Sequence, residues 1–343
     1  MKKLGNVLYV TSPDAFLALD GETVVVKKDE KRAMRLPLHN IEGIVCFNYP
    51  GVSPALMGAC ARRGINLVFL RPSGRFLARV SGPVNGNLLL RKKQFQATQE
   101  TELTVSIAKS CVLGKVYNSR KVLERARRDH ALLVDTQRLK TASDFLKASL
   151  PAIREAEDLE TLRGLEGHAA KQYFRVFGEL ILHQKADFPF RERNRRPPRD
   201  RMNALLSFLY VLLTYEVASA LEAVGLDPQM GFLHADRPGR PSLALDLMEE
   251  LRPVLADRLA LTLVNRKQVK GKGFLIKESG GVLMDDDTRK KVIKAWQERK
   301  QDEITHPFLK ERIPLGLLPH VQATLLARYL RGDLDAYPPF FWS

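Results

Sequence analysis

The spacing of the apolar residues changes once along this chain, and that change limits the fold more than any other feature. Residues 1–85 contain short apolar runs of strand length, separated by turn residues such as Asp20-Gly21. After Gly82-Pro83 and the Asn85-Gly86-Asn87 cluster, apolar residues recur at helical spacing. A chain of 343 residues has room for two domains. We therefore predict an α+β protein, with a small β-rich N-terminal domain at residues 1–85 and a larger all-α domain at residues 86–343.

Turn and capping residues divide the first domain into its elements. Asp20-Gly21 predicts a two-residue hairpin between strands at 16–19 and 22–26. Ser53 as N-cap, a proline directly after it and Gly64 just past the end predict a short helix. Further strands or short apolar runs are expected at 4–10, 36–49, 65–70 and 75–80.

Helices are predicted through most of the second domain. Pro151 is expected to break the helical pattern, and the arginine-rich segment 191–201 is expected to form a loop. Asp200 is placed to cap a nearly all-apolar helix, 201–224, which should end at Gly225 and be buried centrally. The other helices are expected at 92–113, 116–133, 135–150, 153–177, 287–303 and 317–330.

One segment of the helical domain combines an imidazole with several carboxylates. His234 precedes a loop rich in proline and glycine, and Ser242 is placed to N-cap the helix that follows. In that helix Asp246 and Glu249 share a face, with Glu250 beside them. These ligand types suit Mn²⁺ or Mg²⁺ better than a thiolate-bound zinc. The alternative is an ordinary loop histidine and a helix whose acids complement its dipole.

A further acid, Glu166, lies between Gly164 and Gly167 in one of the expected helices. Two glycines in one helical turn cost roughly 1 kcal/mol each relative to alanine, which indicates close approach of another group to that acid. A backbone, a metal ion or a phosphate would qualify. The alternative is a solvated acid near a helix crossing that is lined by small residues.

Basic residues exceed acidic residues along the chain. The formal net charge is +16, and because the excess is not confined to one tail, nucleic acid is the favoured partner. Membrane insertion is not expected, since the longest apolar run, 204–215, is too short to span a bilayer. Cys46, Cys60 and Cys111 form no C-x-x-C pair, so neither a disulfide framework nor a zinc knuckle is indicated. With no signal peptide recognisable at the start, a cytoplasmic protein is expected.

Three separated motifs resemble a known family. They are E-G-x-A-A-x-x-Y-F at 166–174, R-x-x-P-x-D-x-x-N-A-L-L-S-F-x-Y at 195–210, and L-H followed by S-L-A-L-D-L-M-E-E-L-R-P within 233–253. In this order they are similar to the CRISPR-associated spacer-acquisition integrases, and the resemblance covers essentially the whole chain. The T-S-P-D-A sequence at 11–15 looks most like the type I-C branch of that family.

The resemblance implies a metal-dependent DNA endonuclease and integrase, which inserts captured DNA fragments into a CRISPR array by transesterification at 3′ hydroxyls. It implies Glu166, His234 and Asp246 as catalytic ligands of a divalent ion, Mg²⁺ or Mn²⁺. The family often has aspartate where this chain has Glu249, so a ligand role for Glu249 is left open. Asn203 matches an asparagine that supports the site.

The resemblance also implies partners. These are double-stranded DNA, a second copy of the chain bound through the β-rich domain, the small adaptation partner Cas protein two and a further nuclease partner, Cas protein four. Eight basic residues are candidates for DNA binding, with ordinary solvated charge as the alternative for each: Arg195, Arg196, Arg199, Arg237, Arg240, Lys267, Lys270 and Lys272.

Two other functions are weighed against this one. The first is a structure-selective DNA repair nuclease or a transposon-type integrase, which would use the same metal site. The second is a non-catalytic basic DNA-binding scaffold. This alternative is disfavoured because Glu166, His234 and Asp246 are all present.

Overall fold

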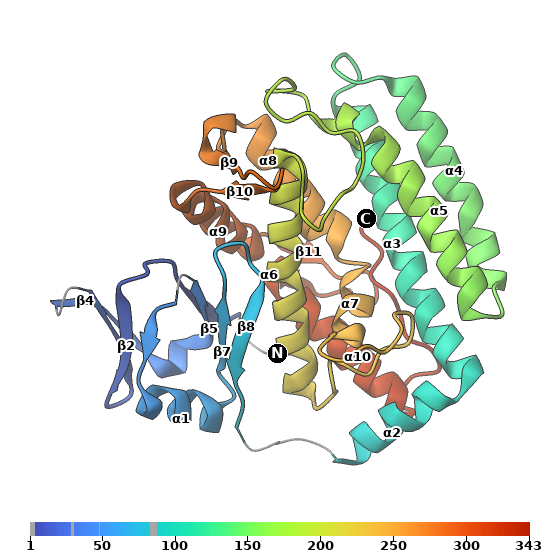
Figure 1. The fold of residues 1–343 in the computed structure, drawn as a ribbon. Coiled ribbons are helices and arrows are strands. Elements are labelled where there is room, and N and C mark those ends of the chain that lie inside the picture. The colour runs from blue at the N-terminus through green and yellow to red at the C-terminus, as the bar shows by residue number, and fades with distance from the viewer. Residues whose placement is uncertain (1–3, 29–30, 48, 83–87) are drawn as a thin grey trace. The chain divides into compact units, whose positions relative to one another are not determined.

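The computed structural model describes residues 4–28, 31–47, 49–82 and 88–343, and the chain divides into two compact units, residues 1–85 and 86–343 (Figure 1). Strands dominate the first unit and helices dominate the second, so the predicted α+β fold class is confirmed. The expected boundary residues 83–87 lie outside the described residues.

The first unit contains two four-stranded sheets that share one core with helix α1. One sheet has the order β1-β5-β7-β8, in which β1, β5 and β7 are parallel and β8 is antiparallel to β7. The other has the order β4-β3-β2-β6. The elements are β1 (Asn6–Val10), β2 (Ala15–Asp20), β3 (Thr23–Lys28), β4 (Lys31–Pro37), η1 (Leu38–Asn40), β5 (Ile41–Phe47), β6 (Gly51–Val52), α1 (Pro54–Arg63), β7 (Asn66–Leu70) and β8 (Phe76–Val80).

Local capping and turn chemistry explains two elements of this unit. The hairpin between β2 and β3 is confirmed, although the pairing of Asp20 with Thr23 places the turn one residue later than predicted. Gly21 supports that turn with a φ of 57°, which other residues rarely adopt. The Ser53 hydroxyl caps α1 by accepting from the Leu56 N–H, and Gly64 ends the helix with a φ of 65°, as predicted.

The second unit consists mainly of helices. In Figure 1, α3, α4 and α5 run side by side, and these three helices contact one another. The elements are α2 (Leu88–Gln99), α3 (Thr101–Asp129), α4 (Thr136–Glu155), α5 (Leu159–Phe177), η2 (Gly178–Leu180), α6 (Arg201–Val224), α7 (Ser242–Met248), the short π-helical turn η3 (Pro253–Asp257), α8 (Arg258–Asn265), η4 (Gly271–Gly273), α9 (Asp286–Gln301), η5 (Leu315–Leu317) and α10 (Leu318–Arg331).

This unit is not entirely helical, which corrects the all-α prediction. Strands β9 (Phe274–Ile276) and β10 (Val282–Met284) form one two-stranded ribbon, and β11 (Glu303–Thr305) and β12 (Arg312–Pro314) form another. Each strand has three residues, too few for a period-2 pattern to be recognised in the sequence.

Two predicted helix breaks were wrong. The break expected near residues 114–115 is absent, because α3 runs unbroken for 29 residues and the chain instead breaks at Glu100, which has extended backbone angles. The Thr104 hydroxyl donates to the Ala97 carbonyl and so satisfies the end of α2 at that break. Pro151 lies inside α4, on its exposed side near the C-terminal end, where losing one backbone hydrogen bond is tolerated.

Helix α6 is the central apolar helix of the second unit. Asp200 caps its first turn by accepting from the Asn203 N–H, and Gly225 ends it with a φ of 90°, so both predicted ends are confirmed. By length and composition alone α6 could cross a bilayer, but over half of its most apolar stretch is buried inside the protein. Because α6 contacts α7, α8, α10 and η3, it serves as a core helix against which the site is built.

Candidate metal centre

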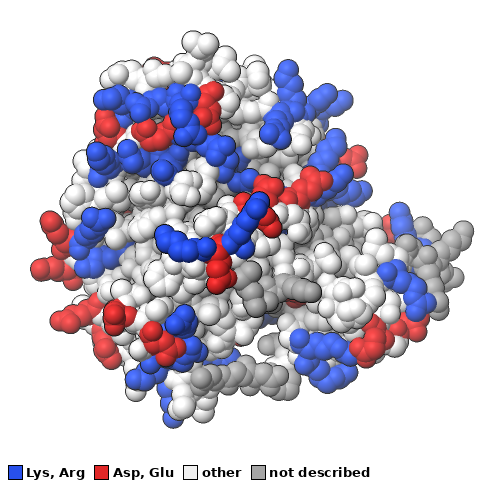
Figure 2. All heavy atoms as spheres, turned by 180° about the vertical axis from the view of Figure 1, so that it is seen from behind, with Lys and Arg blue, Asp and Glu red and all other residues white. Residues whose placement is uncertain are grey.

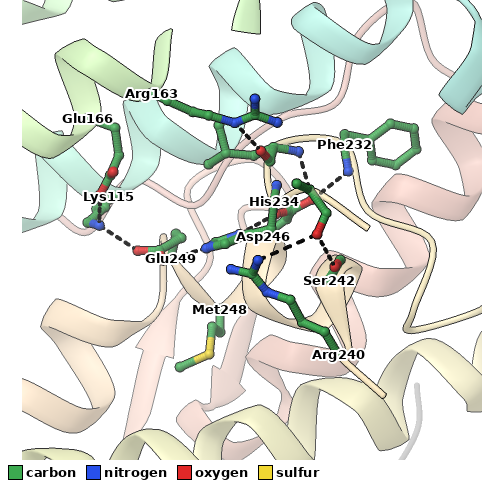
Figure 3. Close-up of polar contacts among 12 residues, drawn as sticks. Lys115, Arg163, Glu166, Phe232, His234, Arg240, Ser242, Asp246, Met248 and Glu249 are labelled. Carbon is green, nitrogen blue, oxygen red and sulfur yellow. Dashed lines mark hydrogen bonds and ion pairs between the residues drawn. The ribbon is translucent and has the colours of Figure 1, made fainter. Parts of the chain in front are cut away.

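Asp246, on α7, accepts four hydrogen bonds from the loop that precedes the helix (Figure 3). Its Oδ2 accepts from the backbone N–H groups of Phe232 (2.6 Å) and Leu233 (2.9 Å). Its Oδ1 accepts from the backbone N–H (3.0 Å) and the ring Nδ1 (2.6 Å) of His234. The side chain is fully buried. Since a carboxylate has about four acceptor positions, the loop engages about as many as Asp246 has.

This contact sets the orientation of the His234 ring. A carboxylate can only accept, so the Nδ1 atom of a neutral His234 must carry the proton. The other ring nitrogen, Nε2, then keeps its lone pair and lies 4.0 Å from Glu249 Oε1. A carboxylate that orients a histidine in this way is the usual outer partner of a metal-binding imidazole.

The start of α7 differs from the prediction. Ser242 is the first helical residue and Pro241 is the cap position, so the predicted Ser242 N-cap was wrong. The Ser242 hydroxyl donates instead to the Ala235 carbonyl (3.3 Å). Gly231 allows the loop to approach the helix, because a Cβ there would lie 2.7 Å from the Ser242 Cβ. Packing against the loop therefore replaces a side-chain cap.

Glu249 follows α7 and is buried among cationic groups. Its Oε1 is paired with the Arg252 guanidinium, and its Oε2 lies 2.7 Å from Lys115 Nζ. Burial by itself would raise the pKa of Glu249, but the charges of Arg252 and Lys115 lower it to about 2. Glu249 is therefore a permanent carboxylate that faces His234.

Lys115 connects Glu249 to Glu166. Lys115 projects from the middle of α3 and Glu166 from α5, and the Lys115 ammonium is paired with Glu166 Oε1 as well as with Glu249 (Figure 3). Burial lowers the pKa of Lys115, but Glu249 and Glu166 raise it more, so it stays above its ordinary value. Arg163, one turn before Glu166, donates to the Leu233 carbonyl (2.7 Å) and ties the histidine loop to α5.

The glycines beside Glu166 do not serve a close backbone contact, which was one of the three roles predicted for them. A Cβ added at Gly164 or Gly167 would meet no atom within 4 Å, so no neighbouring group packs against either position. The two glycines leave open space next to Glu166, and the predicted approach of a metal ion or a phosphate stays a prediction.

Glu250 does not join this site, although the sequence places it beside Asp246 and Glu249. Its carboxylate accepts from the Tyr337 hydroxyl, the Phe340 N–H (2.5 Å) and Gln322 Nε2 (3.1 Å). Burial is the main reason why its pKa is raised to about 7. Glu250 thus anchors the C-terminal residues, whose aromatic side chains at Phe340 and Trp342 are buried.

Asn203 organises the arginine-rich loop and makes no direct contact with the site acids. Its Oδ1 accepts from Arg193 Nη1 (2.7 Å), and its Nδ2 donates to the Glu192 carbonyl (2.8 Å). The Arg193 guanidinium lies over one face of Tyr210 at 5.1 Å, and that of Arg252 also lies over the ring, at 4.8 Å. A series of contacts through Arg193, Tyr210 and Arg252 thus connects Asn203 to Glu249.

The basic candidates are exposed except for Arg240, which is half-buried. Arg195, Arg196 and Arg199 lie on the 191–201 loop, and Arg237 lies on the histidine loop. Burial, together with the charges of Arg237, Arg196 and Arg195, lowers the pKa of Arg240.

The three lysines of the basic set, Lys267, Lys270 and Lys272, are also exposed. No contact links them to His234 or to either site glutamate in the described residues. On the face that Figure 2 shows, Lys and Arg side chains form several groups interspersed with acids, and not one continuous patch.

Two residues of the candidate site were missed from the sequence, Lys115 and Arg252. Lys115 follows an apolar helical stretch, 111–114, and such a lysine is a signal of a buried charge in need of partners. Arg252 follows Glu249 at the three-residue spacing of helical ion pairs.

The chemistry of the site residues suits a divalent cation. In the part of the chain that the structure describes, no three His, Cys, Asp or Glu side chains are arranged to hold a metal ion as they stand. Glu166 and Glu249 nevertheless meet at one cation, the Lys115 ammonium, and His234 directs Nε2 towards Glu249. The buried Oε2 of Glu249 makes no well-oriented hydrogen bond. Two carboxylates and an imidazole are ligands that Mn²⁺ accepts, and Mg²⁺ accepts the carboxylates, so the residues fit.

Comparisons with known proteins agree with the fold and the motifs. The family model described as CRISPR associated protein Cas1 matches residues 8–298. The chain is 55% identical to CRISPR-associated endonuclease Cas1 2 of Rhodospirillum rubrum and 50% identical to CRISPR-associated endonuclease Cas1 1 of Chlorobaculum tepidum, with 100% of both chains covered in each case. A solved casposase bound to integration product is similar in fold, with a TM-score of 0.84 and 21% identity over 98% of this chain and 94% of that one.

The names of two further similar proteins include other CRISPR-associated proteins besides Cas1. A CRISPR-associated exonuclease Cas4/endonuclease Cas1 fusion of Geobacter sulfurreducens is 36% identical over 98% of this chain and 60% of the fusion. A Cas6-RT-Cas1–Cas2 complex has a chain similar in fold, with a TM-score of 0.82 and 22% identity over 100% of this chain and 36% of that one. The family match and the two full-length relatives are decisive: the chain belongs to the Cas1 family of CRISPR-associated endonucleases.

Proposed function

We propose that this chain joins the 3′ hydroxyls of a captured DNA fragment to phosphodiester bonds in a CRISPR array, at a site formed by Glu166, His234 and Glu249. One observation carries the proposal. Glu166 on α5 and Glu249 after α7 come from distant parts of the sequence, yet their carboxylates meet at one ammonium group. Gathering two acids around one cationic position beside an imidazole favours metal-assisted chemistry on phosphate.

This assignment revises the ligand set expected from the family resemblance. That set contained Asp246 and left Glu249 open. Asp246 already accepts four hydrogen bonds, whereas Glu249 faces both Lys115 and His234. We therefore assign Glu249 as the third ligand and Asp246 as the residue that orients His234.

The protein's own groups prepare the site in three ways. Asp246 keeps the proton of His234 on Nδ1, which leaves Nε2 free to bind. Arg252 fixes the Glu249 carboxylate, and Arg163 fixes the loop that carries His234. When bound, Mg²⁺ or Mn²⁺ supplies charge neutralisation at phosphorus and a more acidic hydroxyl nucleophile.

We also assign double-stranded DNA to the basic surface beside the site. Four arginines would contact phosphates there: Arg195, Arg196, Arg237 and Arg240. The proposal is supported by the charges of the first three, which lower the pKa of Arg240. Arg199 and the lysines Lys267, Lys270 and Lys272 would extend this contact, supported by their exposure.

The partners follow from the relatives and from the first unit. A Cas2 partner is supported by the Cas1–Cas2 complex among similar folds, and a Cas4 partner by the Cas4/Cas1 fusion. A homodimer formed through the first unit is supported by Met34, half exposed on the edge strand β4. We further propose a cytoplasmic location and a type I-C-like subtype, the latter supported by the T-S-P-D-A sequence at 11–15.

The test of function is joining, because a repair nuclease would only cut. A labelled short duplex is incubated with a repeat-containing plasmid, Mn²⁺ or Mg²⁺ and the Cas2 partner. Label should become covalently attached to the plasmid and should require free 3′ hydroxyls. Cleavage without any transfer of label would favour the structure-selective repair nuclease.

Matched variants separate the site from general damage to the protein. Glu249→Gln should abolish transfer, since it removes the charge of an assigned ligand at nearly constant size. Glu155→Gln, at an exposed acid of α4, should leave transfer unchanged. Full transfer by the Glu249→Gln protein would refute the ligand assignment.

A further inference from the structure

Lys115 occupies the position between the two site carboxylates because α3 passes unusually close to the chain after α7. The preceding residue is Gly114, and a Cβ there would lie 2.7 Å from the Glu250 Cβ. Any larger residue would push α3 away from the turn that contains Glu249. The close passage brings the Lys115 side chain between Glu249 and Glu166.

Lys115 supplies one of the two positive charges paired with the site glutamates. Glu166 and Glu249 contribute two negative charges, while Lys115 and Arg252 contribute two positive charges. The side chain of Lys115 is 10% exposed, that of Glu249 is 3% exposed and that of Glu166 is 24% exposed, so water screens the Lys115–Glu249 pair weakly and the Lys115–Glu166 pair more. Without a cation between them, the two carboxylates would repel each other and lose much of their stabilisation.

We propose that Lys115 is a positioning residue that holds Glu166 and Glu249 in place while no metal ion is bound, and that its ammonium leaves this position when the ion binds. The inference rests on the proposed metal site. A divalent ion bound by both carboxylates would need the position that the ammonium holds, and two cations at that distance repel strongly. Lys115 therefore keeps the metal-free site ordered and competes with the metal ion.

If the Lys115 ammonium competes with the metal ion, removing its charge should have two opposite effects, one on stability and one on metal affinity. Lys115→Met keeps the length and apolar stem of the side chain but removes the ammonium. The metal-free protein should then unfold at a lower temperature, because the two carboxylates face each other without a cation. The same variant should bind the metal ion more tightly, since no ammonium has to be displaced.

The experiment measures Mn²⁺ binding directly, from the electron paramagnetic resonance signal of the free aquo ion. Lys115→Met should bind Mn²⁺ at least tenfold more tightly than the wild-type protein and should gain more thermal stability on adding Mn²⁺. Lys115→Arg, which keeps the charge, should stay close to wild type. Lys140→Met, at an exposed lysine of α4, is the matched control and should change neither property.

The outcomes distinguish the two proposals. If the wild-type protein binds Mn²⁺ and Lys115→Met binds it equally or more weakly, the competition is refuted while the metal site stands. If neither the wild-type protein nor any variant binds Mn²⁺, the competition by Lys115 and the metal site are both refuted.

A second measurement needs no variant and applies even if Lys115→Met does not fold. In the wild-type protein, acetylation of Lys115 by acetic anhydride is quantified by mass spectrometry. The released amine should react faster with Mn²⁺ present than with EDTA. Equal labelling in the two conditions would also overturn the inference.

Discussion

Asp246→Asn should destabilise the helical unit even when no metal ion is present. The amide has the size of the carboxylate, but its nitrogen donates and cannot accept. If the nitrogen takes the Oδ2 position, the N–H groups of Phe232 and Leu233 lose their acceptor. If it takes the Oδ1 position, only the His234 N–H is left without one, because the ring can move its proton to Nε2 and accept through Nδ1. The second orientation costs less.

The magnitude follows from that second orientation. One buried N–H without an acceptor costs about 1–3 kcal/mol, and exchanging a charged acceptor for a neutral one weakens the remaining bonds by about 1 kcal/mol more. We therefore expect a loss of about 2–4 kcal/mol from an unfolding free energy that is typically about 5–15 kcal/mol. Because Nε2 then carries the proton, the variant should also lose Mn²⁺ affinity.

Urea unfolding in EDTA, followed by tryptophan fluorescence, measures this loss. Both tryptophans, Trp296 and Trp342, lie in the second unit, so the signal reports on that unit. Glu155→Gln on the surface of α4 is the control. An Asp246 that acted mainly as a metal ligand would repel other acids in EDTA, and its neutralisation would then leave stability unchanged or raise it. A loss below about 0.5 kcal/mol, the range of an ordinary surface substitution, would refute the reasoning.

Three further outcomes are expected. The combined variant Arg195→Gln, Arg196→Gln and Arg199→Gln should reduce the slope of log binding constant against log salt concentration by about 2–3, measured on duplex DNA, and an unchanged slope would remove the loop from the DNA surface. Met34→Asp should shift light scattering towards the monomer, and a mass equal to wild type would place the dimer contact elsewhere. Burial raises the pKa of Asp257 to about 6, so the folded chain retains a proton that the unfolded chain releases near pH 4. As the pH rises from about 4 to 6, Asp257 should therefore lower the free energy of unfolding by roughly 3 kcal/mol. Urea unfolding at each pH measures this decrease, which should be smaller by that amount in Asp257→Asn.

Elements whose ends depend on local chemistry could be predicted from the sequence. Asp200 and Gly225 mark both ends of α6, and Ser53 and Gly64 mark those of α1, because a cap or a left-handed glycine acts within one turn. Predictions failed where packing overrides such signals. Pro151 remains inside α4, and α3 continues through Gly114.

The candidate site divides in the same way. Spacing and motif identify Glu166, His234 and the acids after Ser242, since ligand chemistry is a property of residue type and these residues stand in recognisable patterns. Which acid faces the cation is not a local property. Asp246 and Glu249 are three residues apart, yet one turns towards the backbone of the preceding loop and the other towards α3.

The sequence alone determined the fold class, the family and the residue types that can hold a metal ion, because each depends on composition, periodicity or motifs read along the chain. Only the tertiary structure decided that Lys115 from α3 stands between Glu166 and Glu249, and that Asp246 orients His234. Those roles arise from the contacts of α3, α5 and the chain around α7. The physical reason is that a buried charge takes its role from the partners that packing brings within reach, and residues 51 and 134 positions from Lys115 become such partners only when the helices pack.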